Sequence, residues 1–297
     1  FVRHAMSTIS APPSFKVTKV SYNGDLETVN QPISELLKSA SIFARDLFTL
    51  NITSRQERLR SSNRHARRSL SAIEPRDSVI IVSFGNIRAV AGLDHVFLFD
   101  THVPAVRDFA KSLSLAFQNG MYPHDEPFEL VFLENVLSDT IESYQRRLRL
   151  YEPIVDSLLE TVANEVYSDT GVHKLVPMKD SLQSFEIDVK QSLECLTNVI
   201  NDDDKMLGLL LNEQALAQQT SKEVDFERHE HVELLLGVYA RQLSNILVDI
   251  NYALGRIQSK QEFVAIALSG YRNRMVWMNV HIGIAGLTLG IGTTVAG

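Results

Sequence analysis

Small and polar residues recur at alternating intervals of four and three positions near the end of the sequence. The series is Arg272, Val276, Asn279, Gly283, Gly286, Gly290, Thr293 and Gly297. On one α-helix these positions form a single face. If several copies turn that face toward a common axis, glycine carbonyl groups and the Asn and Thr side chains line a narrow water-filled conduit. Asn279 favours this reading because an amide facing lipid is costly. Close helix packing through Gly286 and Gly290 is the alternative.

Acidic residues upstream of this face are candidates for holding a divalent cation. They are Asp188, Asp202, Asp203, Asp204, Glu230 and Glu233. One or two carboxylates per subunit can hold a hydrated ion between neighbouring subunits. The alternative for Asp202–Asp204 is capping of the next helix, where acids stabilise the positive end of the dipole. For the other three the alternative is a solvated helix face.

Other chemistry finds little support in the sequence. The two histidines of the segment Glu227–His231 are too close in sequence for the HExxH zinc motif, so a surface cluster is the better interpretation. We find no nucleophile–base pair, phosphate-binding loop or dinucleotide fingerprint, and therefore predict that the protein is not an enzyme. The net charge of -7 and the pI near 5.7 argue against a nucleic-acid partner. The single cysteine, Cys195, excludes an internal disulfide and fits a reducing compartment.

The polar series lies in a segment that is suited to a membrane. Residues 275–297 contain no Asp, Glu, Lys or Arg. As a helix they would extend about 35 Å, enough to cross a bilayer core of about 30 Å. Arg272 and Arg274 precede the segment and Trp277 lies at its start, which is typical of a membrane boundary. We therefore predict a first transmembrane helix at 275–297, truncated at its end, with the lipid bilayer as a partner.

A long stalk helix is predicted to position this segment. Residues 224–274 contain no proline, and an apolar heptad rhythm continues into the membrane segment. Its members are Tyr239, Leu243, Ile246, Ile250, Ala253, Ile257, Val264, Leu268, Tyr271 and Met275. A polar break lies at Lys260 and Gln261. A helix of this length and pattern predicts partners of its own kind, and thus a homo-oligomer.

The preceding sequence predicts two further regions. Residues 15–123 read as an α/β subdomain with strands at 15–22, 78–83, 87–91 and 95–99 and a helix at 31–48. Residues 124–223 read as a helical subdomain with helices at 129–166, 178–200 and 205–218, the first bent or interrupted at Pro153. Residues 1–14 form an N-terminal stub, either a transit-peptide remnant or a disordered end. The arginine-rich segment 55–68 is interpreted as a solvated loop, with an RNA or lipid-headgroup patch as the alternative.

Several stretches, in this order, resemble the CorA superfamily of magnesium channels, and most closely its eukaryotic mitochondrial (mitochondrial-RNA-splicing-type) branch. They are Ile33–Leu36 with Ala44–Leu47, Ile87–Val90 with Val96–Asp100, Pro127–Glu129 with Leu133–Leu137, Asn201–Asp204, Glu233–Tyr239 and Tyr271–Met275. The family's Gly-Met-Asn signature and second transmembrane helix are expected beyond Gly297. Ser269 stands where the family commonly carries an aspartate, which puts an acidic ring at the pore entrance in doubt.

The resemblance implies an α+β fold. An N-terminal α/β domain has a small mixed or antiparallel sheet flanked by helices, and a helical bundle and a very long stalk helix lead into the transmembrane helix. It implies a homopentamer that conducts Mg²⁺ in the mitochondrial inner membrane, with the N-terminal domain in the matrix. Chloroplast and plasma-membrane locations stay open. It also implies that Mg²⁺ is a regulatory ligand, with Asp188, Glu230 and Glu233 at positions similar to the family's acidic sensors. The alternatives are a non-conducting accessory subunit, which would pair with a paralogue, and a coiled-coil membrane tether.

Overall fold

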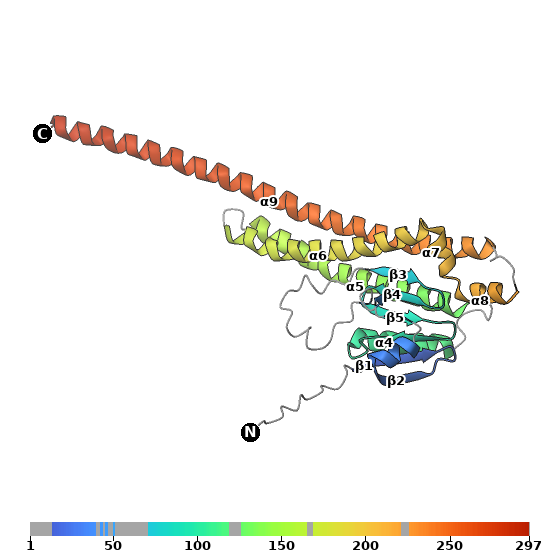
Figure 1. Cartoon of the computed structure of the whole chain (residues 1–297). Helices are drawn as coiled ribbons and strands as arrows, with labels where there is room; N and C mark the ends of the chain where they lie inside the picture. Colours follow the sequence, from blue (N-terminus) through green and yellow to red (C-terminus); the bar gives the residue numbers. More distant parts are fainter. Residues whose placement is uncertain are drawn as a thin grey trace, which may run out of the picture. The chain divides into compact units, whose positions relative to one another are not determined.

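The computed structural model describes residues 14–39, 42–43, 45–46, 50, 71–118, 126–164, 169–220 and 226–296. The chain has an α+β fold (Figure 1). It comprises two compact units, one formed by Phe1–Tyr144 and Asp188–Asn245 and the other by Gln145–Ile187 and Ile246–Gly297. Each unit combines two separate stretches of the chain, so it does not correspond to one predicted region. The predicted division at residues 123 and 223 therefore stays a prediction. The stub 1–14, apart from Ser14, and the segment 55–68 lie outside the described residues.

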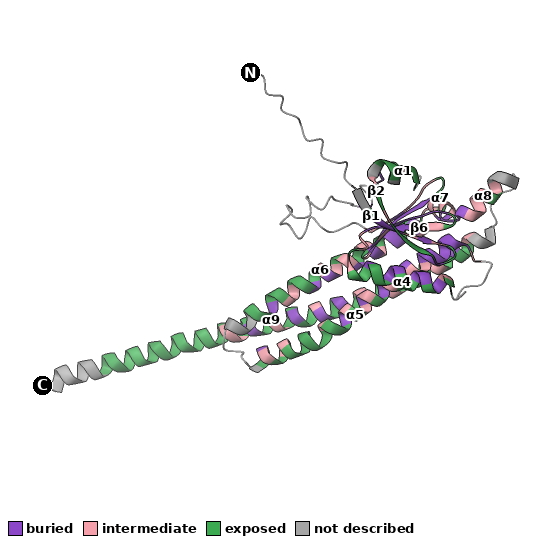
Figure 2. Cartoon of the chain, turned by 90° about the horizontal axis from the view of Figure 1, so that it is seen from below, coloured by how far each residue is buried: buried purple, intermediate pink, exposed green. Residues whose placement is uncertain are grey.

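The first unit contains an antiparallel six-stranded sheet with the strand order β2-β1-β6-β5-β4-β3. The strands are β1 (Ser14–Ser21), β2 (Leu26–Pro32), β3 (Ala72–Pro75), β4 (Ile80–Phe84), β5 (Ile87–Ala91) and β6 (His95–Leu98). The four predicted strands are confirmed as β1, β4, β5 and β6. Every residue of β4 is buried, so both faces of the sheet are covered at that strand. Figure 2 shows the buried residues concentrated in this sheet and the helices beside it.

Two strands and one helix of this unit were not predicted from the sequence. β2 and β3 form the two edges of the sheet, where burial does not enforce a clear alternation of apolar residues. Helix α4 (Pro104–Gln118) begins with a proline, which suits a first helical position. It buries Val106, Phe109 and Leu113 at helical spacing. This pattern was available in the sequence and would have predicted the helix.

The predicted helix at 31–48 is wrong in its bounds. Helix α1 spans Ile33–Ser39, Gln31 and Pro32 belong to β2, and Ile42 and Phe43 are not helical. The Asp46 carboxylate accepts a hydrogen bond from the Phe43 backbone N–H at 3.0 Å. Such a side-chain bond competes with the helical ladder. Ile42, freed from the helix, is buried in the core beside Val17, Ile81 and other apolar residues of the sheet.

The long helices differ from prediction at their prolines. Helix α5 (Phe128–Asn164) contains Pro153, and α6 (Asp169–Ile200) contains Pro177. Of the two outcomes predicted for Pro153, an interruption is therefore wrong, and a bend stays a prediction. Helix α6 begins before the predicted residue 178. Both prolines are exposed, where water can bond the carbonyl group that each leaves without a helical partner.

The predicted helix at 205–218 is two helices, α7 (Asp203–Gly208) and α8 (Leu211–Thr220). Leu209, Leu210 and Leu211 are consecutive and all buried. One straight helix cannot turn three successive side chains into a core, because they point about 100° apart. The chain therefore changes direction at Leu209 and Leu210.

Helix α9 (Phe226–Ala296) has 71 residues and confirms the predicted long helix. The heptad residues from Leu243 to Val264 are buried within the single chain, whereas Tyr271 and Met275 are exposed. Packing within one chain thus explains the apolar heptad pattern up to Val264. The prediction that this pattern by itself requires other copies of the chain is corrected.

Beyond Val264 the described side chains of α9 are exposed or half-buried as far as Thr288 (Figure 2). Within the described part of the chain, no helical stretch is both long enough and apolar enough to traverse a bilayer. The transmembrane helix at 275–297 stays a prediction.

Candidate ion-conducting face and acidic turn

The C-terminal part of α9 places the polar series on one continuous helix face. Arg272, Val276, Asn279, Gly283 and Gly286 are all exposed. A side chain added at Gly283 or Gly286 would meet no other atom within 4 Å. Nothing in the described chain therefore requires glycine at these two positions. Only contacts outside a single chain could require small residues at these two positions.

The remaining members of the face are less fully described. Gly290 and Thr293 lie in α9, but their side chains are outside the described residues, and so is Gly297. Ser269, at the position where the resemblance expects an acid, donates its hydroxyl to the Ala265 carbonyl oxygen at 2.9 Å. The Ser269 hydroxyl thus forms its hydrogen bond within its own helix.

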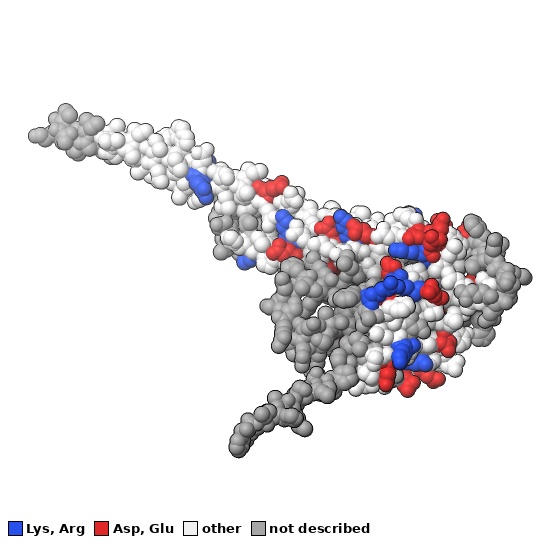
Figure 3. Space-filling view, in the orientation of Figure 1, with Lys and Arg blue, Asp and Glu red and all other residues white. Residues whose placement is uncertain are grey.

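The surface of this segment is almost free of charge. On the face drawn in Figure 3, the last described part of α9 has basic atoms only near its start and no acidic ones. In sequence, Arg272 and Arg274 are the only charged residues after Glu262. The Glu262 carboxylate accepts a hydrogen bond from Gln258 at 3.1 Å. It lies about 15 Å along the helix from Arg272 and cannot neutralise that guanidinium directly.

The opposite side of the helix carries an aromatic pair. His281 Nδ1 lies 2.9 Å from the carbonyl oxygen of Trp277, and the two rings are 4.6 Å apart at their centroids. A carbonyl oxygen only accepts hydrogen bonds, so His281 Nδ1 carries the proton. The imidazole is thereby tied to its own helix.

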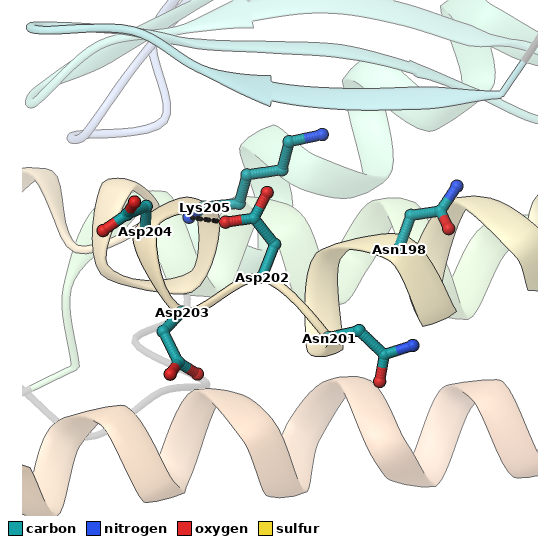
Figure 4. Close-up of a pocket in the computed structure, with 6 residues that line it drawn as sticks. All are labelled: Asn198, Asn201, Asp202, Asp203, Asp204 and Lys205. Atoms are coloured by element: carbon teal, nitrogen blue, oxygen red, sulfur yellow. Dashed lines mark hydrogen bonds between the residues drawn. The ribbon is translucent and has the colours of Figure 1, made fainter.

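The second candidate site is the acidic turn, Asn201–Lys205, between α6 and α7. Asp202 is the N-cap of α7, and its carboxylate accepts the Lys205 backbone N–H at 3.2 Å. The predicted capping role is thus confirmed for Asp202, whereas Asp203 and Asp204 are exposed. The turn lines an open pocket of about 680 Å³, whose lining residues are Asn198, Asn201, Asp202, Asp203, Asp204 and Lys205 (Figure 4).

The side chains of the turn point in different directions. In Figure 4 Asp203 points toward the neighbouring helix, whereas Asp202 and Lys205 point toward the sheet. Asp203 Oδ1 lies 3.9 Å from His229 Nε2 of α9, at the limit of an ion pair. This contact brings the acidic turn next to the first turns of α9.

The other three predicted ligands do not join the turn. Asp188 is half-buried on α6 and has interactions of its own, while Glu230 and Glu233 are exposed on α9. Among the residues that the structure describes, no three His, Cys, Asp or Glu side chains are grouped closely enough to hold a metal ion. A single chain therefore does not assemble the six predicted acids into one site. Figure 3 shows acidic side chains gathered around α7.

The ionic contacts that hold the turn to the sheet were not predicted from the sequence. Lys205 Nζ lies 3.5 Å from Glu74 Oε1 on β3, and Glu74 Oε2 lies 3.6 Å from Arg76 Nη1. Arg76 in turn pairs with the buried Asp46 carboxylate at 3.3 Å. Close packing of Gly208 against Pro75 adds a second attachment, since a side chain at 208 would come within 2.6 Å of that ring. No local signal links Glu74 to Lys205, because they are far apart in sequence.

The side chains of Cys195 and Asp94 have shifted pKa values. Burial raises the pKa of the Cys195 thiol to about 12. A hydrogen bond from His95 lowers the pKa of the exposed Asp94 carboxyl group. Cys195 is thus a neutral core side chain and not a metal ligand or nucleophile.

Comparison with known proteins decides the family. Residues 16–272 match the family described as "Magnesium transporter MRS2-like". The chain belongs to this family. The mitochondrial inner membrane magnesium transporter mrs2 of Schizosaccharomyces pombe is 24% identical over 272 residues, covering 88% of this chain and 60% of the relative.

Two further relatives come from other kingdoms. The human "Magnesium transporter MRS2 homolog, mitochondrial" is 24% identical, and the aligned region covers 95% of this chain and 61% of the relative. The chloroplastic magnesium transporter MRS2-A of rice (Oryza sativa subsp. indica) is 23% identical, and the aligned region covers 96% of this chain and 60% of the relative. The chain thus spans about 60% of the length of these relatives.

Solved structures support the fold independently. The CorA magnesium transporter from Methanocaldococcus jannaschii superposes with a TM-score of 0.55 at 9% identity, covering 92% of this chain and 82% of that one. The full-length CmaX protein superposes with a TM-score of 0.51 at 11% identity, covering 91% and 82%. At such low identity these matches establish a shared CorA-like fold and nothing more.

Proposed function

We propose that this MRS2-like chain is a subunit of a channel that conducts Mg²⁺ through the face running from Arg272 to Gly297. The observation that carries the proposal is the exposed face itself, because its described glycines, Gly283 and Gly286, have no packing role within the chain. Mg²⁺ releases its water reluctantly and prefers oxygen ligands. Carbonyl, amide and hydroxyl groups on this face would bind the hydrated ion weakly enough to release it. A cage of carboxylates would instead trap the ion.

The test is Mg²⁺ flux through the full-length protein in liposomes, comparing two substitutions that introduce the same residue. Gly283→Leu places a large side chain on the proposed face and should remove most of the flux. Ile284→Leu lies one residue away, off the face, and should leave flux near normal. Equal flux in both variants, with equal membrane insertion, would show that this face does not line the pathway.

The assembly that this pathway needs is proposed to be a homopentamer. A second, exposed apolar stripe on α9 supports an oligomer, since such stripes mark interaction surfaces. It consists of Leu234, Val238, Val248, Tyr252, Phe263 and Ile266, which are between 49% and 73% exposed. The proposed partner is a second copy of the chain, and residues 275–297 would cross the bilayer. A monodisperse monomer of the full-length protein in mild detergent would overturn this part, and copurification of a different subunit would favour the accessory role.

Regulation by Mg²⁺ is proposed to involve Asp188, Glu230, Glu233 and the acidic turn. Because a single described chain holds no cluster of three ligands, the ion would be held in hydrated form between subunits. Binding only to the folded assembly stabilises it by mass action. Low-millimolar Mg²⁺ should therefore raise the melting temperature, and the double variant Asp188→Ala with Glu230→Ala should reduce that shift. An unchanged shift would exclude these two residues as sensors.

We propose the mitochondrial inner membrane as the location, with the N-terminal domain in the matrix. The names of the yeast and human relatives support mitochondria, while the rice relative is chloroplastic. Protease protection of the N-terminal domain in intact mitoplasts, and its loss after the inner membrane is permeabilised, is the expected result. Cleavage in intact mitoplasts would contradict the orientation, and recovery in plastids would contradict the location.

A further inference from the structure

The two edges of the six-stranded sheet are protected to different degrees. The edge strand β3 has four residues and ends at Pro75. Helix α7 packs against it, since Gly208 lies close to the Pro75 ring and Lys205 pairs with Glu74. Short length, a proline and a covering helix are means by which proteins keep a sheet edge from pairing with another chain. The β3 edge is therefore closed.

The opposite edge strand, β2, lacks these protections along most of its length. It has seven residues, pairs regularly with β1 and has its one proline at its last position. Leu26, Glu27, Thr28 and Asn30 are exposed, and Glu27 is the only charged residue of the strand. Figure 1 shows β2 at the margin of the sheet, and no other described strand pairs with its outer side. An edge of this kind is a template for a further strand.

The turn between β1 and β2 determines which backbone groups of β2 point outward. The Ser21 N–H donates to the Asp25 carbonyl oxygen at 3.1 Å, so residue 25 directs its carbonyl group toward β1. Successive residues of an antiparallel ladder point their backbone groups to alternate sides. Leu26, Thr28 and Asn30 therefore present their N–H and C=O groups to the outer side. Among the described residues, none bonds these outward groups.

We propose that the outer edge of β2 pairs antiparallel with β2 of a second copy of the chain, centred on Thr28. In this register Thr28 lies opposite Thr28 of the other copy, and Leu26 lies opposite Asn30. All three outward residues thus meet outward residues. Glu27 lies opposite Val29, so the two Glu27 carboxylates do not face each other. Threonine pairs across strands are favourable, whereas like charges directly opposite are not. The strand is therefore complementary to itself.

This contact differs in symmetry from the association proposed for α9. When the same strand of two copies meets itself, the contact has twofold symmetry and joins copies two at a time. Such a contact does not close a ring of five. It would instead link two separate assemblies edge to edge. The inference does not rest on the proposed function, because two single chains would pair through β2 in the same way.

Disulfide cross-linking of the full-length protein in a Cys195→Ala background tests the register. Thr28→Cys places two thiols on a hydrogen-bonded pair whose Cα atoms would be about 5.5 Å apart, within reach of a disulfide. Leu26→Cys is the matched control on the same strand, because its two copies would lie about 13 Å apart. Linked pairs of chains should form about tenfold faster with Thr28→Cys than with Leu26→Cys. Mixing the Leu26→Cys protein with an Asn30→Cys protein should restore the linking.

A second variant tests the pairing without any cross-link. Thr28→Pro removes an outward N–H and leaves the ladder with β1 intact, as edge strands allow. Sedimentation of the full-length protein in detergent should show assemblies of doubled mass at high concentration. Thr28→Pro should abolish the doubling and leave the melting temperature nearly unchanged. Doubling that persists in Thr28→Pro would show that β2 is not the contact.

The cross-linking experiment has three outcomes that would overturn the proposal. Equal linking of Thr28→Cys and Leu26→Cys would mean that chance collisions, and not a register, bring the chains together. Linking of Thr28→Cys to a different protein would mean that the edge binds a foreign strand. No linking at all, with the thiol open to maleimide, would mean that the edge stays unpaired. None of these outcomes depends on whether the protein conducts Mg²⁺.

Discussion

Lys205 lies in the acidic turn, yet its ammonium group is directed to β3, where it meets Glu74 at 3.5 Å. This pairing leaves the carboxylates of Asp203 and Asp204 without a neutralising lysine. We predict that Glu74→Gln frees Lys205 to fold back on these acids and compete with Mg²⁺. The Mg²⁺ concentration that gives half of the thermal stabilisation should rise about fivefold, as expected for an interaction of about 1 kcal/mol.

The control for this prediction is a second substitution. Lys205→Met in the Glu74→Gln background removes the competing cation and should restore the original midpoint. If Glu74→Gln alone leaves the midpoint unchanged, Lys205 does not control the charge of the turn. If the unmodified protein shows no response to Mg²⁺, the proposed sensor fails instead.

Cys195 provides a prediction that depends on pH. Burial raises the pKa of its thiol to about 12, above the value of about 8.5 in an unfolded chain. Between these values the unfolded chain loses the proton while the folded chain keeps it. The protonated Cys195 thiol therefore makes its full contribution to the free energy of unfolding below about pH 8.5. That free energy falls by about 1.4 kcal/mol per pH unit as the pH rises toward 12.

Urea unfolding at pH 7.5 and pH 9.5, compared between the wild type and Cys195→Ala, measures this contribution. Stability should fall more steeply with pH in the wild type, and iodoacetamide should modify Cys195 only in urea. Equal slopes in the two proteins, or rapid modification of the native thiol, would show that Cys195 is not buried as described.

At the scale of elements, α9 carries two apolar stripes with different roles. Ile250 is buried within the chain, whereas Val248 is 63% exposed. Ile250→Ala should cost roughly 2–5 kcal/mol of folding stability. Val248→Ala should change folding stability by less than about 0.5 kcal/mol but weaken association of copies. Urea unfolding and sedimentation separate the two effects. Loss of folding stability in Val248→Ala with intact association would reverse the assignment.

How far the elements could be predicted depended on the kind of signal that each carries. Helix α9 and the strands β4 to β6 were predicted because long apolar rhythms and glycine-marked turns are local signals. The bounds of α1 and the break between α7 and α8 were not, because Asp46 and the burial of Leu209 and Leu210 act through tertiary contacts. The capping role of Asp202 was a local signal and is confirmed, whereas the contact of Glu74 with Lys205 had none.

At the scale of the whole molecule, the decisive question is where Arg272 lies in the assembly. Five guanidinium groups near one axis would repel a divalent cation by several kcal/mol if unscreened, since the energy scales as ~332/(εr). Ser269 bonds its own helix, and Glu262 lies about 15 Å away along the helix, so neither residue of the same chain compensates this charge. Compensation must come from anions, wide water-filled spacing or another subunit. The alternative is that Arg272 and Arg274 both anchor the helix at the membrane boundary.

The most direct test of the account is Mg²⁺ entry into liposomes that contain the full-length protein, followed with a magnesium-sensitive fluorophore. We predict that the unmodified protein admits Mg²⁺. Arg272→Ser should change the flux and its dependence on salt, whereas Arg274→Ser, which lies off the proposed face, should do little. No flux through the correctly inserted wild type would contradict the proposed function. Identical behaviour of the two variants would contradict the ion-conducting face.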